Sequence, residues 1–171
     1  MILKRILLII SIVAVVNISQ AQNSVEIKYT DSSLLHLDKI LLTNTTNIED
    51  IFAAIGKADR VVDYKNIEKN YFYDSLGMII LTKDGKIKGL GINYNWDGDK
   101  KFPEKSFTGN LKIGELSISK NTKKDDIAAI KSLEFVCPIE SICASKNREA
   151  NVNSVISFTD NNITQIVFLI K

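Results

Sequence analysis

Residues 34–56, LLHLDKILLTNTTNIEDIFAAIG, decide the fold because residues 110–132, NLKIGELSISKNTKKDDIAAIKS, repeat their pattern without a gap. A shift of 76 positions (111 minus 35) aligns the two halves of the chain. The matches include Leu35 with Leu111, Leu37 with Ile113, Ile40 with Leu116, Thr46 with Thr122, Asp50 with Asp126, Ile51 with Ile127, Ile79 with Val155, Asp84 with Asp160 and Ile87 with Ile163. They fall on apolar, turn and cap positions, so they predict a tandem duplication.

Each copy begins with a predicted hairpin and a predicted helix. Asp38-Lys39 separates residues of alternating polarity, and Gly114-Glu115 takes that place in the second copy. Thr46-x-x-Glu49 and Thr122-x-x-Asp125 fit the capping box that opens a helix. Apolar residues at 48, 51, 52 and 55 then form one helical stripe, and Gly56 is a typical stop.

Strands follow each helix. Residues 78–82 and 87–94 flank an Asp-Gly turn, and residues 154–159 and 163–170 flank Asp160-Asn161-Asn162. The helix stripe must be buried against a sheet. The sequence therefore predicts the α+β class: a tandem duplication of a ββ-α-ββ(β) unit, as a two-layer antiparallel sheet with one helix per repeat.

The first 21 residues read as a signal peptide. Lys4 and Arg5 precede the apolar residues 6–16, and Ser19-Gln20-Ala21 fits a cleavage site. We therefore expect an exported protein, periplasmic or secreted, without a membrane span after cleavage. The predicted parts are a signal peptide at 1–21, repeat 1 at 22–95, a connector at 96–109 and repeat 2 at 110–171, with the two repeats in one domain.

Charge argues against two classes of partner. Removing Lys4 and Arg5 with the signal leaves 22 minus 2, or 20, basic residues against 20 acidic ones. The charges are mixed along the chain, without the basic stripe that nucleic-acid binding requires. We expect neither nucleic acid nor an acidic membrane as partner.

The connector contains the best metal-binding pattern. Asn93, Asn95, Asp97, Asp99 and Glu104 have the spacing of a twelve-position calcium loop, with a glycine at the sixth position. Against calcium, the first position is Asn, the eighth is Lys, a proline precedes the glutamate, and the preceding segment reads as a strand. The alternative is a polar linker whose Asp-Gly turns the chain.

Cys137 and Cys143 are the only cysteines. In an oxidising compartment we expect them to form a structural disulfide. Their spacing is not the C-x-x-C of redox enzymes, and with a single histidine they do not complete a zinc site.

No set of residues suggests an enzyme. His36 is the only histidine, sits on a predicted strand and has no nucleophile beside it in the pattern. Acid pairs such as Glu49-Asp50 suit a helix start better than acid–base catalysis. We expect neither catalysis nor a cofactor.

Four aromatic residues, Tyr71, Tyr73, Tyr94 and Trp96, are candidates for a contact surface. Tyr71 and Tyr73 share a strand face, and interfaces are enriched in such side chains. The alternative is that these rings lie in the core or at its rim.

Two motifs carry a resemblance to a known family. Asp74-x-Leu76-Gly77-Met78 with Lys83-Asp84-Gly85, and the stretch at 102–113 containing Phe102-Pro103, Lys105, Phe107 and Gly109, resemble a family of bacterial exported proteins of unknown function. The likeness spans the mature chain and implies a domain type without an activity.

A more distant resemblance concerns the helix. Thr46-x-x-Glu49-Asp50-Ile51 followed by Gly56-Lys57-Ala58 is similar to BamE-like envelope proteins, although Ala58 replaces their proline. The tandem arrangement also resembles β-lactamase inhibitory protein. These resemblances imply protein binding on a sheet face.

The sequence therefore favours a non-enzymatic protein-binding module of the cell envelope: an inhibitor, an immunity-type factor or an assembly accessory factor. The alternative is an envelope protein that binds a small ligand or calcium.

Overall fold

The computed structural model describes residues 24–31, 34–64, 67–146 and 150–171, and the predicted signal peptide lies outside this part of the chain. The first half contains β1 (Glu26–Asp31), β2 (Leu34–Leu37), β3 (Ile40–Leu41), α1 (Ile48–Ile55), β4 (Arg60–Tyr64), β5 (Glu68–Tyr73), β6 (Met78–Lys83) and β7 (Lys86–Asn93). The second half contains β8 (Asn110–Ile113), β9 (Leu116–Ile118), α2 (Lys124–Ala128), β10 (Phe135–Ile139), β11 (Ile142–Ser145), β12 (Val152–Thr159) and β13 (Asn162–Ile170).

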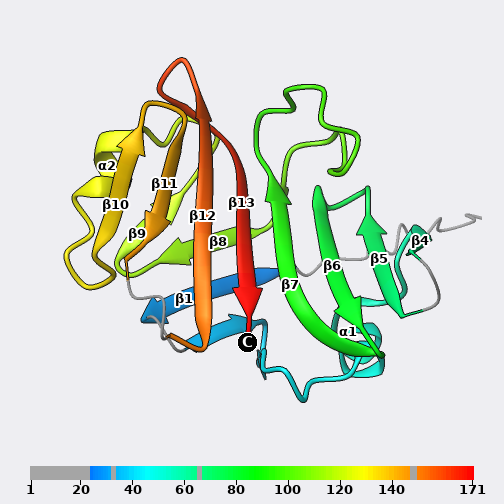
Figure 1. Cartoon of the computed structure of the whole chain (residues 1–171). Helices are drawn as coiled ribbons and strands as arrows, with labels where there is room; N and C mark the ends of the chain where they lie inside the picture. Colours follow the sequence, from blue (N-terminus) through cyan, green and yellow to red (C-terminus); the bar gives the residue numbers. More distant parts are fainter. Residues whose placement is uncertain (1–23, 32–33, 65–66, 147–149) are drawn as a thin grey trace, which may run out of the picture.

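The strands form two sheets that pack face to face. The larger sheet has eight strands in the order β10-β11-β12-β13-β7-β6-β5-β4, and the smaller has five in the order β3-β2-β1-β8-β9. All pairs of the larger sheet are antiparallel, whereas β1 pairs antiparallel with β2 and parallel with β8. In Figure 1 the strands of the smaller sheet run across the back of the larger one.

The predicted α+β class is wrong, because the chain is mainly β and each sheet buries its apolar face against the other. The two helices of the described residues are short, with eight residues in α1 and five in α2. They bury only Ile48, Ile51 and Ile127, so they flank the core and do not form a layer of it. The prediction also missed β1, which joins the two hairpins into one sheet.

The predicted hairpins are confirmed. Asp84 and Gly85, at φ 51° and 74°, turn β6 into β7, and Asp160 and Asn161, at φ 49° and 61°, turn β12 into β13. Two consecutive residues of positive φ match the twist of the strands that they join. Asn, Asp and Gly tolerate this backbone, which explains why these turns can be read from the sequence.

The predicted capping boxes are displaced by one residue. The helices begin after Asn47 and Lys123, whose backbone N–H groups donate to the carboxylates of Asp50 (3.0 Å) and Asp126 (2.8 Å). Thr46 instead accepts a hydrogen bond from the N–H of Thr43 at 3.0 Å, and so closes the turn before α1. Thr46 and Thr122 therefore fix the chain just before each helix. The acid three positions after each cap residue accepts the hydrogen bond of the cap residue's backbone N–H.

The core lies between the sheets. Tyr29 of β1 meets Phe168 of β13 edge to face, with ring centroids 5.1 Å apart. The Tyr29 hydroxyl donates to the carbonyl of Val152 at 3.0 Å, so the phenol also hydrogen-bonds across the two layers. Among the described residues, no helix is long and apolar enough to span a membrane.

Candidate binding surface

The face of the larger sheet that points away from the smaller sheet, here called the outer face, is rich in apolar side chains. The strand register aligns one row of them across the sheet, comprising Ile79, Gly91, Val167, Val155, Ala144 and Val136. Val136 of this row is 45% exposed, and Leu169 on β13 and Ile139 on β10 are 44% and 55% exposed beside the row. An antiparallel sheet usually turns polar residues to solvent, so this face departs from the expected alternation.

The segment at 94–109, between β7 and β8, folds back over part of the outer face. The N–H of Phe107 donates to the carbonyl of Asn93 at 2.7 Å, and the N–H of Thr108 donates to the carbonyl of Leu76 at 3.2 Å. Gly77, at φ 74°, lies directly beneath, because a Cβ there would meet the backbone nitrogen of Phe107 at 2.5 Å. Backbone hydrogen bonds therefore fix this segment against the sheet.

Phe102 is the side chain that this segment places on the sheet. A Cβ at Gly91 would lie 2.6 Å from Cγ2 of Ile79 and 3.0 Å from Cε1 of Phe102. Both approaches are too close for a methyl group, so glycine at 91 makes room for the ring. Phe102 thus covers Gly91 beside the buried Ile79, whereas Val167 and Val155 are only partly buried.

Three hollows follow one another along this segment. The apolar hollow has about 480 Å³ and lies beside Phe102. Its lining includes Tyr64, Leu81, Val167, Leu169, Lys88 and Lys101. The charged hollow, of about 450 Å³, shares Phe102 with it and also contains Trp96. The polar hollow, of about 420 Å³, shares Trp96 and includes Asn95, Asp97, Asn121 and Thr164.

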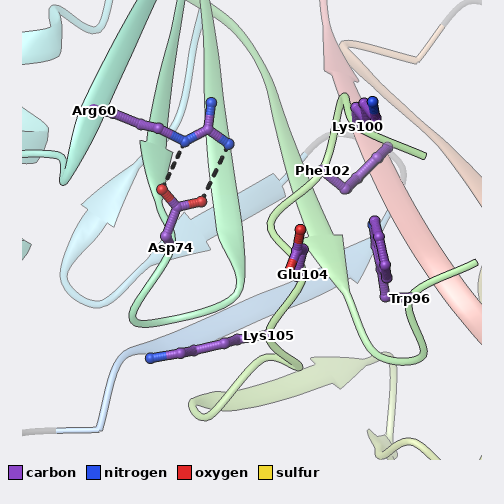
Figure 2. A pocket seen from close by; sticks show the side chains of 7 residues that line it. All are labelled: Arg60, Asp74, Trp96, Lys100, Phe102, Glu104 and Lys105. Carbon is purple, nitrogen blue, oxygen red and sulfur yellow. Dashed lines mark hydrogen bonds and ion pairs between the residues drawn. The ribbon is translucent and has the colours of Figure 1, made fainter. Parts of the chain in front are cut away.

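Arg60 and Asp74 form one wall of the charged hollow (Figure 2). The guanidinium donates to both carboxylate oxygens of Asp74, at 2.7 and 3.2 Å. It also lies 3.5 Å from the centroid of the Phe72 ring, a cation–π contact. This pairing holds Arg60 in one orientation, so its charge is largely neutralised within the protein.

The opposite wall comes from the connector. Trp96 is 42% exposed, and its indole N–H donates to the carbonyl of Asp99 at 3.2 Å, which orients the ring. Glu104 lies between the two walls in Figure 2, and Lys100 and Lys105 extend from the same segment. An oriented exposed indole beside charged groups is typical of residues that anchor protein interfaces.

The five residues of the predicted calcium loop make separate contacts. The amide of Asn93, fully buried, donates to the carbonyl of Lys105 at 3.0 Å, and the amide of Asn95 donates to the carbonyl of Ile163 at 2.6 Å. Asp97 accepts from the side chain of Gln165 at 3.0 Å, and Asp99 accepts from the N–H of Lys101 at 2.9 Å. Glu104 lines the charged hollow.

These contacts bear on the calcium pattern. Within the described residues, no group of three or more His, Cys, Asp or Glu side chains is arranged to hold a metal ion. Asn93, Asn95 and Asp97 tie the connector to the sheet, and Asp99 closes a turn within the connector, which is sufficient reason for their presence. Calcium binding there stays a prediction.

The four predicted contact aromatics occupy different environments. Tyr73 and Tyr94 are buried, and their hydroxyls donate to the carbonyls of Gly56 (3.0 Å) and Ile118 (3.4 Å). Burial raises the pKa of both phenols well above the usual range, with the Asp59 carboxylate adding to the effect at Tyr73. Tyr71 packs against Phe52 of α1, at a centroid distance of 5.6 Å. Of the four, Trp96 alone is exposed on the outer side of the molecule.

The predicted disulfide is confirmed. Cys137 and Cys143 are bonded, which joins the edge strand β10 to β11. Cys143 is fully buried in the core, and Cys137 packs against it. The bridge therefore holds β10, the outermost strand of the second half, to its neighbour β11 on the core side of the sheet.

Sequence reasoning missed Arg60, Phe102 and the lysines that line the hollows. Arg60 and Phe102 are more than 40 positions apart, and neither belongs to a periodic pattern. In the sequence, Phe102 belongs only to the family motif at 102–113. Gly91, which lies against it, is a signal that could have found it, because a glycine inside an apolar strand indicates close approach of another group.

Comparison with known proteins supports the coarser part of the family resemblance, a domain of unknown function. A family profile described as "Domain of unknown function (DUF7738)" matches residues 26–128, from the start of β1 to the end of α2. No curated protein matches significantly. A crystal structure of a cysteine-rich secretory protein (SAV1118) from Staphylococcus aureus subsp. aureus Mu50 is similar to this chain with a TM-score of 0.47 and 15% identity. The match covers 75% of this chain and 44% of that protein, so this chain spans less than half of its length. The likenesses to BamE-like proteins and to β-lactamase inhibitory protein stay predictions.

Proposed function

The chain belongs to the DUF7738 family, a family of unknown function, and from this premise we propose that it is a non-enzymatic module that binds another protein on the outer face of its larger sheet. The role would be that of an inhibitor, an immunity-type factor or an assembly accessory factor. Export to the envelope is part of the proposal, and the Cys137–Cys143 disulfide supports it, since such bridges persist in oxidising compartments.

The observation that carries the proposal is the exposed apolar side chains of the outer face. Val136 at the end of the row, Ile139 on the same strand and Leu169 on β13 are exposed, although the core between the sheets is already complete without them. Keeping such side chains in water costs about 25 cal/mol for each Å² of apolar surface, and apolar side chains exposed on one face are typical of a docking site. Strands held in a hydrogen-bonded sheet present these side chains with little entropy to lose on binding.

A tandem duplication is the second part of the proposal, and the central strand pair supports it. β7 pairs antiparallel with β13, and Gly91 stands opposite Val167, the residue 76 positions later (167 minus 91). The residues around this pair therefore follow a local two-fold axis. A side-chain contact supports the same relation: Lys86 donates to Asn47 at 2.7 Å, and Lys123 donates to Asn162, with the two residue types exchanged at corresponding positions.

Capture of a partner by surface variants tests the function. Full-length protein with a C-terminal tag is purified from the source organism under mild crosslinking, as wild type, Leu169→Asp and Val136→Asp. The control is Leu41→Asp on β3 of the smaller sheet, because Leu41 is 41% exposed and so matches Leu169. We expect the two outer-face variants to lose at least about tenfold in capture of a stoichiometric partner, equivalent to about 1.4 kcal/mol. Equal capture by all four proteins, or no partner for the wild type, would contradict the proposal.

A further inference from the structure

The apolar hollow and the charged hollow adjoin each other at Phe102, and their combined lining carries an excess of positive charge. Its basic side chains are Arg60, Lys83, Lys88, Lys100, Lys101 and Lys105, and its acidic ones are Glu68, Asp74 and Glu104. Six cations face three carboxylates there, whereas the chain after residue 21 has 20 of each. The surplus is therefore local to this part of the outer face.

Pairing within the protein leaves four of these cations unbalanced. Arg60 is neutralised by Asp74 at 2.7 Å, and Lys83 lies 3.8 Å from Glu68. Among the residues that the structure describes, no ion pair is found for the other four lysines of the lining, and of the three carboxylates of the lining Glu104 alone has no cation paired with it. Unpaired cations at the rim of an apolar hollow attract a group of opposite charge through Coulomb interaction.

The apolar part of the lining favours an acidic protein segment over a nucleic acid as the anionic partner. Leu81, Val167, Leu169 and Phe102 line the same hollow as Lys88 and Lys101, so the hollow suits an apolar group from a ligand that also carries negative charge. A nucleic acid would instead present phosphates to a broad basic stripe, and stacking would need exposed aromatic rings in series. The two exposed rings of the lining, Trp96 and Tyr64, lie in different hollows, so they do not form such a series.

Resting on the proposed function, we infer that the partner is a protein whose docking segment is acidic and inserts an apolar side chain into the hollow beside Phe102. Lys88 and Lys101 pair with carboxylates on either side of that side chain, and Lys100 and Lys105 extend the positive surface toward Trp96. Association is then steered by charge and weakened by salt, while the apolar contact holds the complex.

Charge reversal tests this inference separately from the proposed function. Lys88→Glu/Lys101→Glu is compared in the capture experiment with Lys112→Glu/Lys131→Glu, which changes the net charge equally at two exposed lysines outside the outer face. We expect the first variant to reduce capture at least tenfold and the control to retain it. Capture by wild type should fall steeply from about 0.05 M to about 0.5 M NaCl. The contacted partner segment, mapped by mass spectrometry of the crosslinked peptides, should be rich in Asp and Glu.

The other outcomes distinguish the two claims. Loss of capture with Leu169→Asp but not with Lys88→Glu/Lys101→Glu would overturn the acidic-segment inference and leave the docking face intact. No loss with either would overturn both. Binding of wild type to phosphatidylglycerol vesicles that is lost in Lys88→Glu/Lys101→Glu, together with an uncharged segment in the crosslinked peptides, would assign the cations to lipid and overturn the inference.

Discussion

Reduction of the Cys137–Cys143 disulfide should lower stability without changing the packing. The bond closes a loop with a sequence separation of 6 residues. In the chain-entropy description, freeing a loop of this size in the unfolded chain costs about 2 kcal/mol of folding free energy. For a chain of this length, each kcal/mol of lost stability lowers the midpoint temperature of thermal unfolding by about 2–4 °C. We therefore expect reduction to lower that temperature by about 4–8 °C.

Reduction is preferable to substitution, because Cys143 is fully buried and an alanine there would add the cost of a cavity. Thermal unfolding is followed by circular dichroism with and without a reductant, with free thiols counted in each sample. The Cys137→Ala/Cys143→Ala variant serves as the control, since the reductant should not shift its midpoint. Oxidised and fully reduced wild type that melt within about 1 °C of each other would refute the reasoning.

Three further predictions concern the core and the outer face. Tyr29→Phe removes the hydroxyl that donates to the carbonyl of Val152, and should lower the free energy of unfolding by about 1 kcal/mol in urea titration. A urea unfolding curve with the midpoint and slope of wild type would disprove this link between the sheets. Gly91→Ala should cost about 1–3 kcal/mol in the same assay, because the new methyl group meets Ile79 and Phe102, and a variant as stable as wild type would show that room exists there. The free energy of unfolding should fall as the pH rises above about 10, because burial raises the pKa of Tyr94 in the folded chain and the unfolded chain releases that proton first. Tyr94→Phe should flatten this pH dependence. Equal slopes of unfolding free energy against pH for the variant and wild type would contradict it.

Local features of the fold could be predicted from the sequence. The turns at Asp84-Gly85 and Asp160-Asn161 and the hairpin at Asp38-Lys39 depend on residues that are adjacent in the chain. The two helices are predicted at the right places, and the stripe at 48–55 with its stop at Gly56 matches the bounds of α1. A short apolar stripe predicts a helix. It does not indicate that two sheets pack against each other and that the helix lies beside them.

Long-range pairing was beyond such reasoning. β1 pairs with β8 although the paired residues are 84 positions apart (110 minus 26), and the polar and apolar alternation of β1 is only six residues long. The burial of Tyr73 and Tyr94 depends on Gly56 and on β9, which no local pattern connects with these rings. The charged and apolar hollows combine a strand edge, a turn and the connector, so they exist only once the larger sheet has formed.

Site-specific photocrosslinking at the outer face tests the central claim most directly. A photoreactive amino acid is placed at Leu169 on β13 and, in a second protein, at Leu41 on β3, two exposed leucines on different sheets. The account predicts one discrete adduct with another protein from position 169 and none from position 41. Adducts from neither position, or the same adduct from both, would contradict a docking site on this face.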